Sequence, residues 1–355
     1  MAMIRLRTAH KWAHSSKTAR SVLVQGFLSL ALIAPAVADA VSDFYSGKSI
    51  NMIISTGVGG GLDANARMVA RHIGNQIPGR PSVVPRNMTG AGHLQATNFM
   101  FNQAPRDGTH IGAILPSFAL YQLIDGKGAQ YDSRKFNWIG SSDVDNMNVY
   151  VWHAANVRSA EDAKRTEVLM GGTGAGSYTI LFPTLMNNLL GTKFKMVPGY
   201  KSTNEIHLAM ERGEVQGRAG NFFSSLKSGN ADWLRDKKID LIAQIGAARD
   251  ADFPNVPLLQ ELAPNEEAAR IIRLFSAEIA MGRSYLTTPD TPADRLAALQ
   301  KAFDATMRDP GFLDEAKKAA IDVRPLKAPQ LQAILDDIMS SPADLLEKAK
   351  DARGR

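Results

Sequence analysis

Two successive sets of short β-rich runs, each alternating with helical patterns, limit the fold of this 355-residue chain more than any other feature. In the helical stretches, apolar side chains recur at spacings of three and four residues. Such alternation is typical of α/β units built around a mainly parallel sheet. In the first set we expect strands at residues 50–55, 82–85 and 111–115, and helices at residues 62–77, 91–102 and 118–124.

The alternation starts again after a loop that lies between expected strands at residues 138–139 and 149–152. Within this second set, Ser202 and Glu205 have capping-box spacing at the start of a helix. Residues 253–257, Phe-Pro-Asn-Val-Pro, break regular structure and suit a segment that crosses back to the first set. The other expected strands are residues 167–170, 194–197, 215–219, 239–245 and 274–281, and the other helices are residues 177–190, 203–212, 292–307, 311–320 and 328–350.

The first forty residues have the layout of a secretory signal peptide. A basic start is followed by an apolar run at residues 22–34 and by small residues at Ala36, Ala38 and Ala40. The run is short for a membrane span, so we expect export with cleavage after Ala38 or Ala40. An uncleaved N-terminal anchor is the alternative. No apolar stretch of about 18 residues follows, which predicts a mature protein that does not span the membrane.

Charge and cysteine content exclude several functions once this leader is set aside. The leader holds five of the 41 basic residues and one of the 35 acidic ones, so the net formal charge falls from +6 to about +2. A nearly neutral chain without a basic run gives no support for a nucleic-acid surface. The chain has no cysteine, which excludes disulfides, thiolate metal sites and a cysteine nucleophile.

Three glycine-rich loops lie between an expected strand and the helix that follows it. They are Thr56-Gly57-Val58-Gly59-Gly60-Gly61, Asn87-Met88-Thr89-Gly90-Ala91-Gly92-His93 and Gly171-Gly172-Thr173-Gly174-Ala175-Gly176-Ser177. Glycine lets the backbone approach a ligand, and free amides at a helix start attract an anion. One such loop is usually only a tight turn, but three at the carboxyl ends of strands predict a ligand site there.

Enzyme signatures are poor. The first loop does not have the G-x-G-x-x-G spacing of a dinucleotide site, and no G-x-S-x-G elbow is present to hold a nucleophilic serine. The histidines after the leader include no H-x-x-x-H pair, so a zinc helix is not expected. His93 is open to two interpretations, as a ligand contact or as a surface or capping residue.

A cluster of polar residues lies at the end of the expected strand at residues 215–219. Arg218 could form a bidentate pair with a carboxylate, or a salt bridge at the surface of the protein, and both interpretations remain open. Asn221 lies next to it. Tyr200, Lys201 and Ser202 precede a helix and could face a cleft, although capping is the simpler role for Ser202.

Together these motifs resemble the periplasmic solute-binding receptors of tripartite tricarboxylate transporters, the Bug-type family. That family's A-G-G-G-T-D, N-R-P-G-A-G-G and A-P-D-G-Y-T segments correspond to residues 58–63, 87–93 and 104–110. Its V-P-Y-K-G-S resembles Val197-Pro198-Gly199-Tyr200-Lys201-Ser202 with one extra glycine, and its D-V-P segment resembles residues 254–257. The likeness covers the whole chain after the leader, in order.

The chain also departs from the family pattern. Leu62 and Met88 replace a common threonine and arginine in the first two loops. Where the family often has F-D-N, this chain has Ala219-Gly220-Asn221, which removes an aspartate and leaves Arg218 nearby. The resemblance therefore does not carry over the identity of the ligand.

The resemblance implies an α/β, two-domain periplasmic-binding-protein fold of type II, the Venus flytrap, with two crossing segments as the hinge. Domain I would comprise residues 41–145 and 265–355, domain II would comprise residues 146–264, and the ligand cleft would lie between them. The implied ligand-binding residues are Thr56, Val58, Gly59, Gly60, Ala91, Gly92 and Ser117 from the first domain, and Thr173, Gly174, Ser177, Tyr200, Asn221 and the charge partner Arg218 from the second.

The implied function is that of a periplasmic receptor that captures a small organic carboxylate and delivers it to a membrane permease. No catalytic residue, metal or cofactor is expected, nucleic acid is not a partner, and the protein would be a monomer. Two alternatives remain: an exported sensor that docks on a signalling receptor, and an exported enzyme that uses the same cleft. The ligand is left open among aliphatic di- or tricarboxylates, aromatic acids and neutral vitamin-like compounds.

Overall fold

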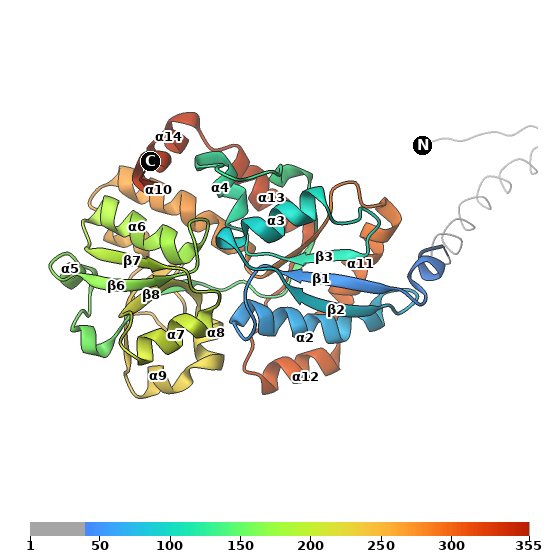
Figure 1. The fold of residues 1–355 in the computed structure, drawn as a ribbon, viewed down its shortest axis with the longest axis horizontal. Helices are drawn as coiled ribbons and strands as arrows, with labels where there is room; N and C mark the ends of the chain where they lie inside the picture. Colours follow the sequence, from blue (N-terminus) through green and yellow to red (C-terminus); the bar gives the residue numbers. More distant parts are fainter. Residues whose placement is uncertain (1–39, 355) are drawn as a thin grey trace, which may run out of the picture. The chain divides into compact units, whose positions relative to one another are not determined.

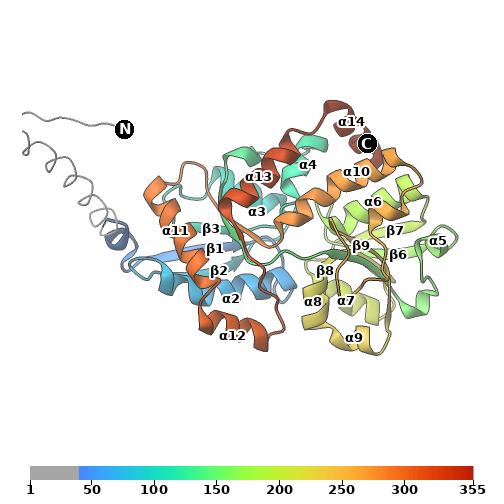
Figure 2. The same cartoon turned by 180° about the vertical axis from the view of Figure 1, so that it is seen from behind.

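The computed structural model describes residues 40–354. The predicted leader and its cleavage site fall almost entirely outside this range. Within it, no helix is both long enough and apolar enough to cross a membrane. Residues 41–355 cluster as one compact unit that contains two separate β-sheets (Figures 1 and 2).

The first sheet has six strands in the order β11-β4-β10-β3-β1-β2. Strand β1 pairs in parallel with β2 and β3, whereas β10 is antiparallel to β3 and β4. The strands are β1 (Ser49–Ile54), β2 (Ser82–Asn87), β3 (His110–Ala113), β4 (Asn137–Ser141), β10 (Ser284–Thr287) and β11 (Leu326–Lys327). The helices around it are α2 (Gly61–Gln76), α3 (Leu94–Asn102), α4 (Phe118–Ile124), α11 (Ala293–Thr306), α12 (Pro310–Lys318) and α13 (Ala328–Met339).

Alternating side chains of β1 explain why helices cover both faces of this sheet. Ile50, Met52 and Ile54 are buried in a cluster with residues of α2, α11 and α12. Ile53 points the other way, into a cluster with residues of α3, α4 and α13. A strand that is apolar on both faces must be sandwiched between helices, which is the arrangement visible in Figure 1.

The second sheet has five strands in the order β7-β6-β8-β5-β9. Strand β6 is parallel to β7 and β8, and β5 is antiparallel to β8 and β9. The strands are β5 (Met147–Trp152), β6 (Val168–Gly172), β7 (Phe194–Pro198), β8 (Gly217–Phe222) and β9 (Ile239–Ile245). The remaining helices are α5 (Ala160–Ala163), α6 (Tyr178–Leu190), α7 (Thr203–Glu211), α8 (Phe223–Gly229), α9 (Ala231–Arg235), α10 (Glu266–Ala277) and α14 (Ala343–Arg353).

The predicted α/β fold with two sheets is confirmed, and most expected elements are present within a few residues of their predicted bounds. Only half of the predicted capping box is present: the Glu205 N–H donates to the Ser202 side chain at the start of α7, but the Glu205 carboxylate accepts the N–H of Lys201 and not that of Ser202. The exact division into domains I and II stays a prediction. Three expectations about the last third of the chain are wrong.

Residues 274–281 were expected as a strand, but they complete helix α10 and a short 3₁₀ turn, Glu278–Met281. The Asn265 side chain caps α10 by accepting the Ala268 N–H. Ala268, Ile271, Ile272 and Phe275 then form one buried face. The apolar run is therefore the end of an amphipathic helix, and the strand that follows is β10.

Residues 328–350 were expected as one helix, but they form two, α13 and α14. Pro342 separates them, because the residue before a proline is disfavoured in the helical conformation. Residues 253–257 do not run between the sheets. They lie beside β9, where the Gln244 side chain donates to the carbonyls of Phe253 and Val256.

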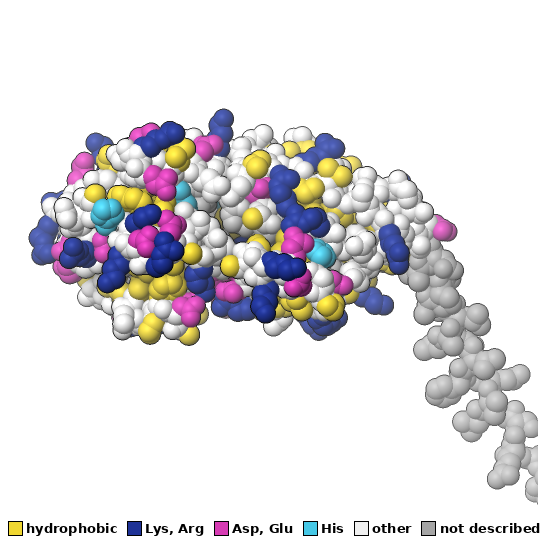
Figure 3. All heavy atoms as spheres, turned by 90° about the horizontal axis from the view of Figure 1, so that it is seen from below, with side chains coloured by type: hydrophobic (Ala, Val, Ile, Leu, Met, Phe, Trp, Pro, Cys, Tyr) yellow, Lys and Arg dark blue, Asp and Glu magenta, His cyan; other side chains and the backbone are white. Residues whose placement is uncertain are grey.

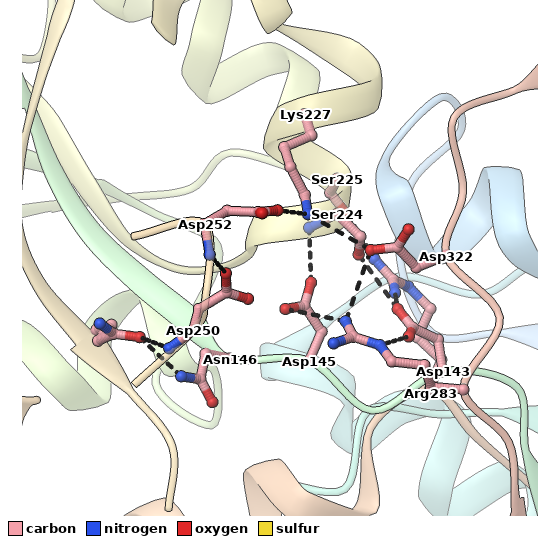
Figure 4. Close-up of polar contacts among 12 residues, drawn as sticks. Asp143, Asp145, Asn146, Ser224, Ser225, Lys227, Asp250, Asp252, Arg283 and Asp322 are labelled. Atoms are coloured by element: carbon pink, nitrogen blue, oxygen red, sulfur yellow. Dashed lines mark hydrogen bonds and ion pairs between the residues drawn. The ribbon is translucent and has the colours of Figure 1, made fainter. Parts of the chain in front are cut away.

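The chain passes between the sheets after β4 and again before β10, and charged residues gather at these two crossings (Figure 4). Asp143 forms an ion pair with the buried Arg283 and a second one with Arg324. Asp145 accepts the Ser224 N–H at 2.6 Å. Lys227 of α8 contacts Asp252 and Asp322, and so it links the second-sheet side to the segment that precedes β11.

The C-terminal helix α14 also joins the two sides. It packs on α6 and on α4. Near its end, Arg353 forms an ion pair with Asp125 and donates a hydrogen bond to the Ala175 carbonyl at 3.0 Å. Its guanidinium also lies over the Tyr121 ring. One apolar cluster accordingly runs without interruption from the first sheet to the second.

Candidate functional site

A cavity of about 270 Å³ lies where loops that follow strands of both sheets meet. Loops after β1, β2 and β3 form one wall, and loops after β6 and β7, together with Arg218 and Gly220 of β8, form the other. The loops lie at the carboxyl ends of the strands that they follow, the edge where ligands of open α/β sheets bind. The lining residues are Ser55, Thr56, Thr89, Gly90, Gly92, His93, Leu115, Thr173, Ser177, Tyr178, Thr179, Gly199, Tyr200, Lys201, Ser202, Thr203, Arg218 and Gly220.

The first glycine loop, residues 56–61, is held in place by the buried carboxylate of Asp63. Its oxygens accept hydrogen bonds from the Gly59 N–H at 2.8 Å, from Asn87 at 2.7 Å and from Arg67 at 2.9 Å. Burial opposes ionisation of Asp63, but these hydrogen bonds outweigh it and hold the pKa of the carboxyl below its ordinary value. The Asn87 amide also donates to the Thr56 carbonyl, so one polar cluster fixes the loop.

The second loop takes a backbone course that ordinary residues rarely adopt. Four successive residues, Gly90, Ala91, Gly92 and His93, have positive φ angles of 145°, 46°, 61° and 82°. This course brings His93 under the cavity, where its Nδ1 lies 3.2 Å from the Ser55 carbonyl oxygen. Burial lowers the pKa of His93 to about 4, so the imidazole is neutral at physiological pH.

The wall from the second sheet is rich in hydroxyl groups. The Ser177 hydroxyl donates to the Gly174 carbonyl at 2.7 Å and contacts the Thr179 hydroxyl at 2.6 Å. The Thr179 hydroxyl in turn accepts the Thr173 N–H. Tyr200 is placed by its own N–H, which donates to the Gly172 carbonyl.

Arg218 is the buried cation of this wall. Its side chain is 2% exposed, and its Nε and Nη2 make only long contacts to the carbonyls of Ala219 and Gly220, at 3.4 and 3.5 Å. Its Nη1 is buried and has no hydrogen-bond partner in the described part of the chain. Burial lowers the pKa of Arg218, and the nearby Tyr150 opposes that shift.

Neutral groups lie behind Arg218. The Tyr150 hydroxyl lies 2.6 Å from His207 Nε2, and the Asn221 amide donates to the same hydroxyl at 3.4 Å. Burial, together with the charge of Arg218, lowers the pKa of His207 to about 3, and burial raises that of Tyr150 to about 12. Both groups are therefore uncharged between these limits.

The two walls touch each other through backbone at the edge of the cavity. The Gly57 N–H donates to the Lys201 carbonyl at 3.2 Å, and the Asn204 side chain donates to the Gly59 carbonyl at 2.8 Å. At the other edge, a Cβ added to Gly174 would lie 2.9 Å from the Gly92 nitrogen. Glycine is required at such positions because a side chain would hold the walls apart.

Six of the thirteen residues expected at a ligand site line this cavity: Thr56, Gly92, Thr173, Ser177, Tyr200 and Arg218. The others lie nearby without being among its lining residues. Val58 is 68% exposed at the tip of the first loop, and Asn221 is behind Arg218. Gly59, Gly60, Ala91 and Gly174 lie in the loop backbones where the walls meet. Ser117 instead lines a smaller hollow beside Glu278.

Several lining residues were not expected from the sequence, among them Ser55, Thr89, Leu115, Tyr178 and Thr179. Each lies within four residues of an expected site residue, so its position near the end of a predicted strand could have identified it. Lys201, Ser202 and His93, whose roles were left open, also line the cavity. Residues 40–354 contain no cluster of three or more side chains suited to a metal ion.

Comparison with known protein families gives one match over most of the chain. The family described as "Tripartite tricarboxylate transporter family receptor" matches residues 65–350. A UPF0065 protein of Bordetella bronchiseptica is 24% identical over 300 residues, which cover 82% of this chain and 84% of that protein. A UPF0065 protein from the gbd 5′ region of Cupriavidus necator is 26% identical over 65% of this chain and 69% of its own length.

Solved structures share the fold at low sequence identity. The periplasmic binding protein BugD has a TM-score of 0.70 at 20% identity, covering 87% of this chain and 98% of its own. An R. palustris protein solved with adipate has a TM-score of 0.67 at 17% identity, with coverages of 87% and 98%. MatC from Rhodopseudomonas palustris, solved with bound malate, has a TM-score of 0.64 at 16% identity, with coverages of 86% and 99%.

Proposed function

The chain belongs to the tripartite tricarboxylate transporter receptor family, and on this premise we propose that it captures a small organic carboxylate outside the cytoplasm for uptake. The family match agrees with the resemblance drawn from the glycine loops. Receptors of this kind bind and release a ligand without changing it. The protein would work in the periplasm as a monomer and deliver its ligand to a membrane permease.

The charge of the cavity lining carries the proposal. The described lining residues include two cations, Lys201 and Arg218, and no aspartate or glutamate. Five further lining residues are threonines, and hydroxyl groups and loop amides are suitable donors to a carboxylate. An anion would find donors on both walls, whereas a cation would meet the buried guanidinium.

The ligands of related structures support the same class of compound. MatC was solved with malate, and the R. palustris protein of similar fold was solved with adipate. Both compounds are dicarboxylates, which are small enough for a cavity of about 270 Å³. The proposed site is the set of thirteen residues named from the sequence, extended by the newly found lining residues.

We assign the arrangement described here to the closed form of the receptor. The contacts between Gly57 and Lys201 and between Gly59 and Asn204 can form only when the two walls are together. A ligand that touches both walls would stabilise this form over an open one. Domains I and II would then turn about the two crossings after β4 and before β10.

Titration calorimetry of the purified protein against a panel of carboxylates tests this function. We expect at least one carboxylate to bind with one-to-one stoichiometry and to be recovered unchanged. At a hundred times its dissociation constant, it should stabilise the protein by about 2.7 kcal/mol. The proposal would be overturned if no carboxylate binds, or if the bound compound is converted to a reaction product.

A further inference from the structure

The guanidinium of Arg218 is a buried charge for which the described part of the protein provides no counter-ion. Arginine stays protonated in proteins, so burial does not neutralise it. The structure records no ion pair for it, and its Nη1 lacks even a neutral acceptor. The groups behind it, Tyr150, His207 and Asn221, are uncharged.

A buried and unpaired charge is unfavourable, and in a stable fold it calls for a partner. Tyr150 of β5 is the cross-strand neighbour of Arg218, and its hydroxyl contacts His207 of α7. Arg218 also lines the cavity, together with Gly220. A ligand in the cavity is therefore in position to supply the missing negative charge.

The opposite wall offers a second unsatisfied group. Thr56, at the end of β1, also lines the cavity, and its hydroxyl is buried without a hydrogen-bond partner. Beside it lie the amides and hydroxyls of the first two glycine loops. The cavity thus has a neutral donor set on the first-sheet wall and a full positive charge on the second-sheet wall.

We propose that the site is built for a dianion, one of whose anionic groups is held by the first-sheet loops at Thr56 while the other pairs with Arg218. This inference rests on the proposed function and narrows it to dicarboxylates. Arg218 is then the residue that determines specificity for the second charge. It selects against monocarboxylates, which leave it unpaired, and against amino acids, whose ammonium group it repels.

The test compares aliphatic dicarboxylates of four to six carbons with half-amides of the same length, in which one carboxylate is replaced by a neutral amide. We expect the wild-type protein to prefer the dicarboxylate by roughly 10- to 100-fold, the range for a hydrogen bond to a charged group. Arg218→Met should reduce this preference to below about threefold while leaving the half-amide affinity nearly unchanged. Arg218→Lys should restore part of the preference.

Lys195→Met is the matched control, because it removes an exposed cation of the second-sheet side that does not line the cavity. It should leave the ratio of the two affinities unchanged. The ligand-free Arg218→Met variant should melt no lower than the wild type, since an uncompensated buried charge is replaced by an apolar side chain. A lower melting temperature with unchanged ligand preference would mean a purely structural role and would overturn the inference.

The remaining outcomes separate the inference from the function on which it rests. Equal binding of dicarboxylates and half-amides by the wild type overturns the inference and leaves the receptor function standing. Loss of half-amide binding in Arg218→Met also overturns it, because Arg218 would then hold the only recognised carboxylate. If no carboxylate binds to the wild type, the proposed function fails, and the inference fails with it.

Discussion

Single buried carboxyl groups hold key parts of this protein in place, and they do so in opposite protonation states. Asp63 is ionised and collects three donors around the first glycine loop. Glu278, which follows α10, is buried, and its Oε2 accepts a long hydrogen bond from the Leu120 N–H, at 3.4 Å. Burial raises the pKa of Glu278 to about 8. Local donors explain the difference, because only Asp63 has enough of them to offset its burial.

Replacing Asp63 by alanine should loosen the first glycine loop. The Gly59 N–H and the side chains of Arg67 and Asn87 would lose their acceptor. We expect the free energy of unfolding to fall by roughly 2–4 kcal/mol, as measured by urea denaturation. Asp314→Ala, which breaks an exposed pair with Lys318, should change it by less than about 1 kcal/mol. Equal stability of the two variants would contradict the role given to Asp63.

Glu278 should make stability depend on pH. In the unfolded chain the carboxyl loses its proton near its ordinary pKa of 4.5, whereas in the folded protein it keeps the proton up to about pH 8. The stabilising contribution is therefore complete below pH 4.5 and is lost as pH rises to 8, by at most about 1.4 kcal/mol per pH unit. Glu278→Gln, which mimics the protonated form, should gain stability relative to wild type over this interval.

Urea denaturation of both proteins between pH 5 and 8.5 would measure this difference. Glu266→Gln serves as the control, because Glu266 is an exposed residue paired with Arg273. Its stability relative to wild type should stay constant within about 0.5 kcal/mol across the same range. A Glu278→Gln difference that does not change with pH would show that the carboxyl is ionised when buried.

At the level of elements, loops at strand ends were easier to predict from the sequence than the last third of the chain. Periodicity and glycine position placed β1, α2 and the three loops, because each lies within one local pattern. Residues 274–281 were misassigned because a short apolar run fits a strand or a buried helix equally well, and the Asn265 cap decides between them. Arg218 could be identified as a candidate, but its lack of a counter-ion depends on neighbours distant in sequence.

The contact between the first glycine loop and the start of α7 predicts that Gly57→Ala weakens closure. The added Cβ would lie 2.8 Å from the Lys201 carbonyl oxygen, and this oxygen belongs to the opposite wall. We expect ligand affinity to fall roughly 5- to 100-fold, the equivalent of about 1–3 kcal/mol of overpacking. Stability without ligand should be almost unchanged, because an open form relieves the clash.

Gly229→Ala is the matched control for this experiment, because a Cβ at that helical position meets nothing within 4 Å. It should bind the ligand as the wild type does. Calorimetry with any carboxylate that binds the wild-type protein would measure both variants. Unchanged affinity in Gly57→Ala would mean that ligand binding does not need the two walls in contact.

At the scale of the whole molecule, a buried ion pair lies at the crossings between the sheets, whereas exposed charges of both signs are mixed. The face shown in Figure 3 carries basic and acidic side chains side by side, without a field of one sign. At the crossings, by contrast, Asp143 has no exposed surface and is paired with Arg283 and Arg324 (Figure 4). Lys227 and Asp322 complete the network at a more exposed position.

Two substitutions in this network should differ strongly in effect. Asp143→Asn leaves the buried Arg283 without its anion and should lower the free energy of unfolding by about 3–5 kcal/mol. Asp322→Asn removes two partly exposed ion pairs, with Lys227 and Arg324, and should lower the free energy of unfolding by less than about 1 kcal/mol, with an effect that fades in high salt. Urea denaturation at two salt concentrations would measure the free energy of unfolding of both variants. Similar effects for the two variants would contradict a buried electrostatic link at the crossing.

The position of Arg353 suggests a way to measure ligand binding to this protein in real time. Because its guanidinium donates a hydrogen bond to the Ala175 carbonyl, we expect movement of the third glycine loop to displace the end of α14. An environment-sensitive dye attached to that helix should therefore change its emission when the cavity fills, although dye and ligand never meet. The same hydrogen bond argues against fusing a bulky tag directly to the end of this helix, since the tag would displace the loop.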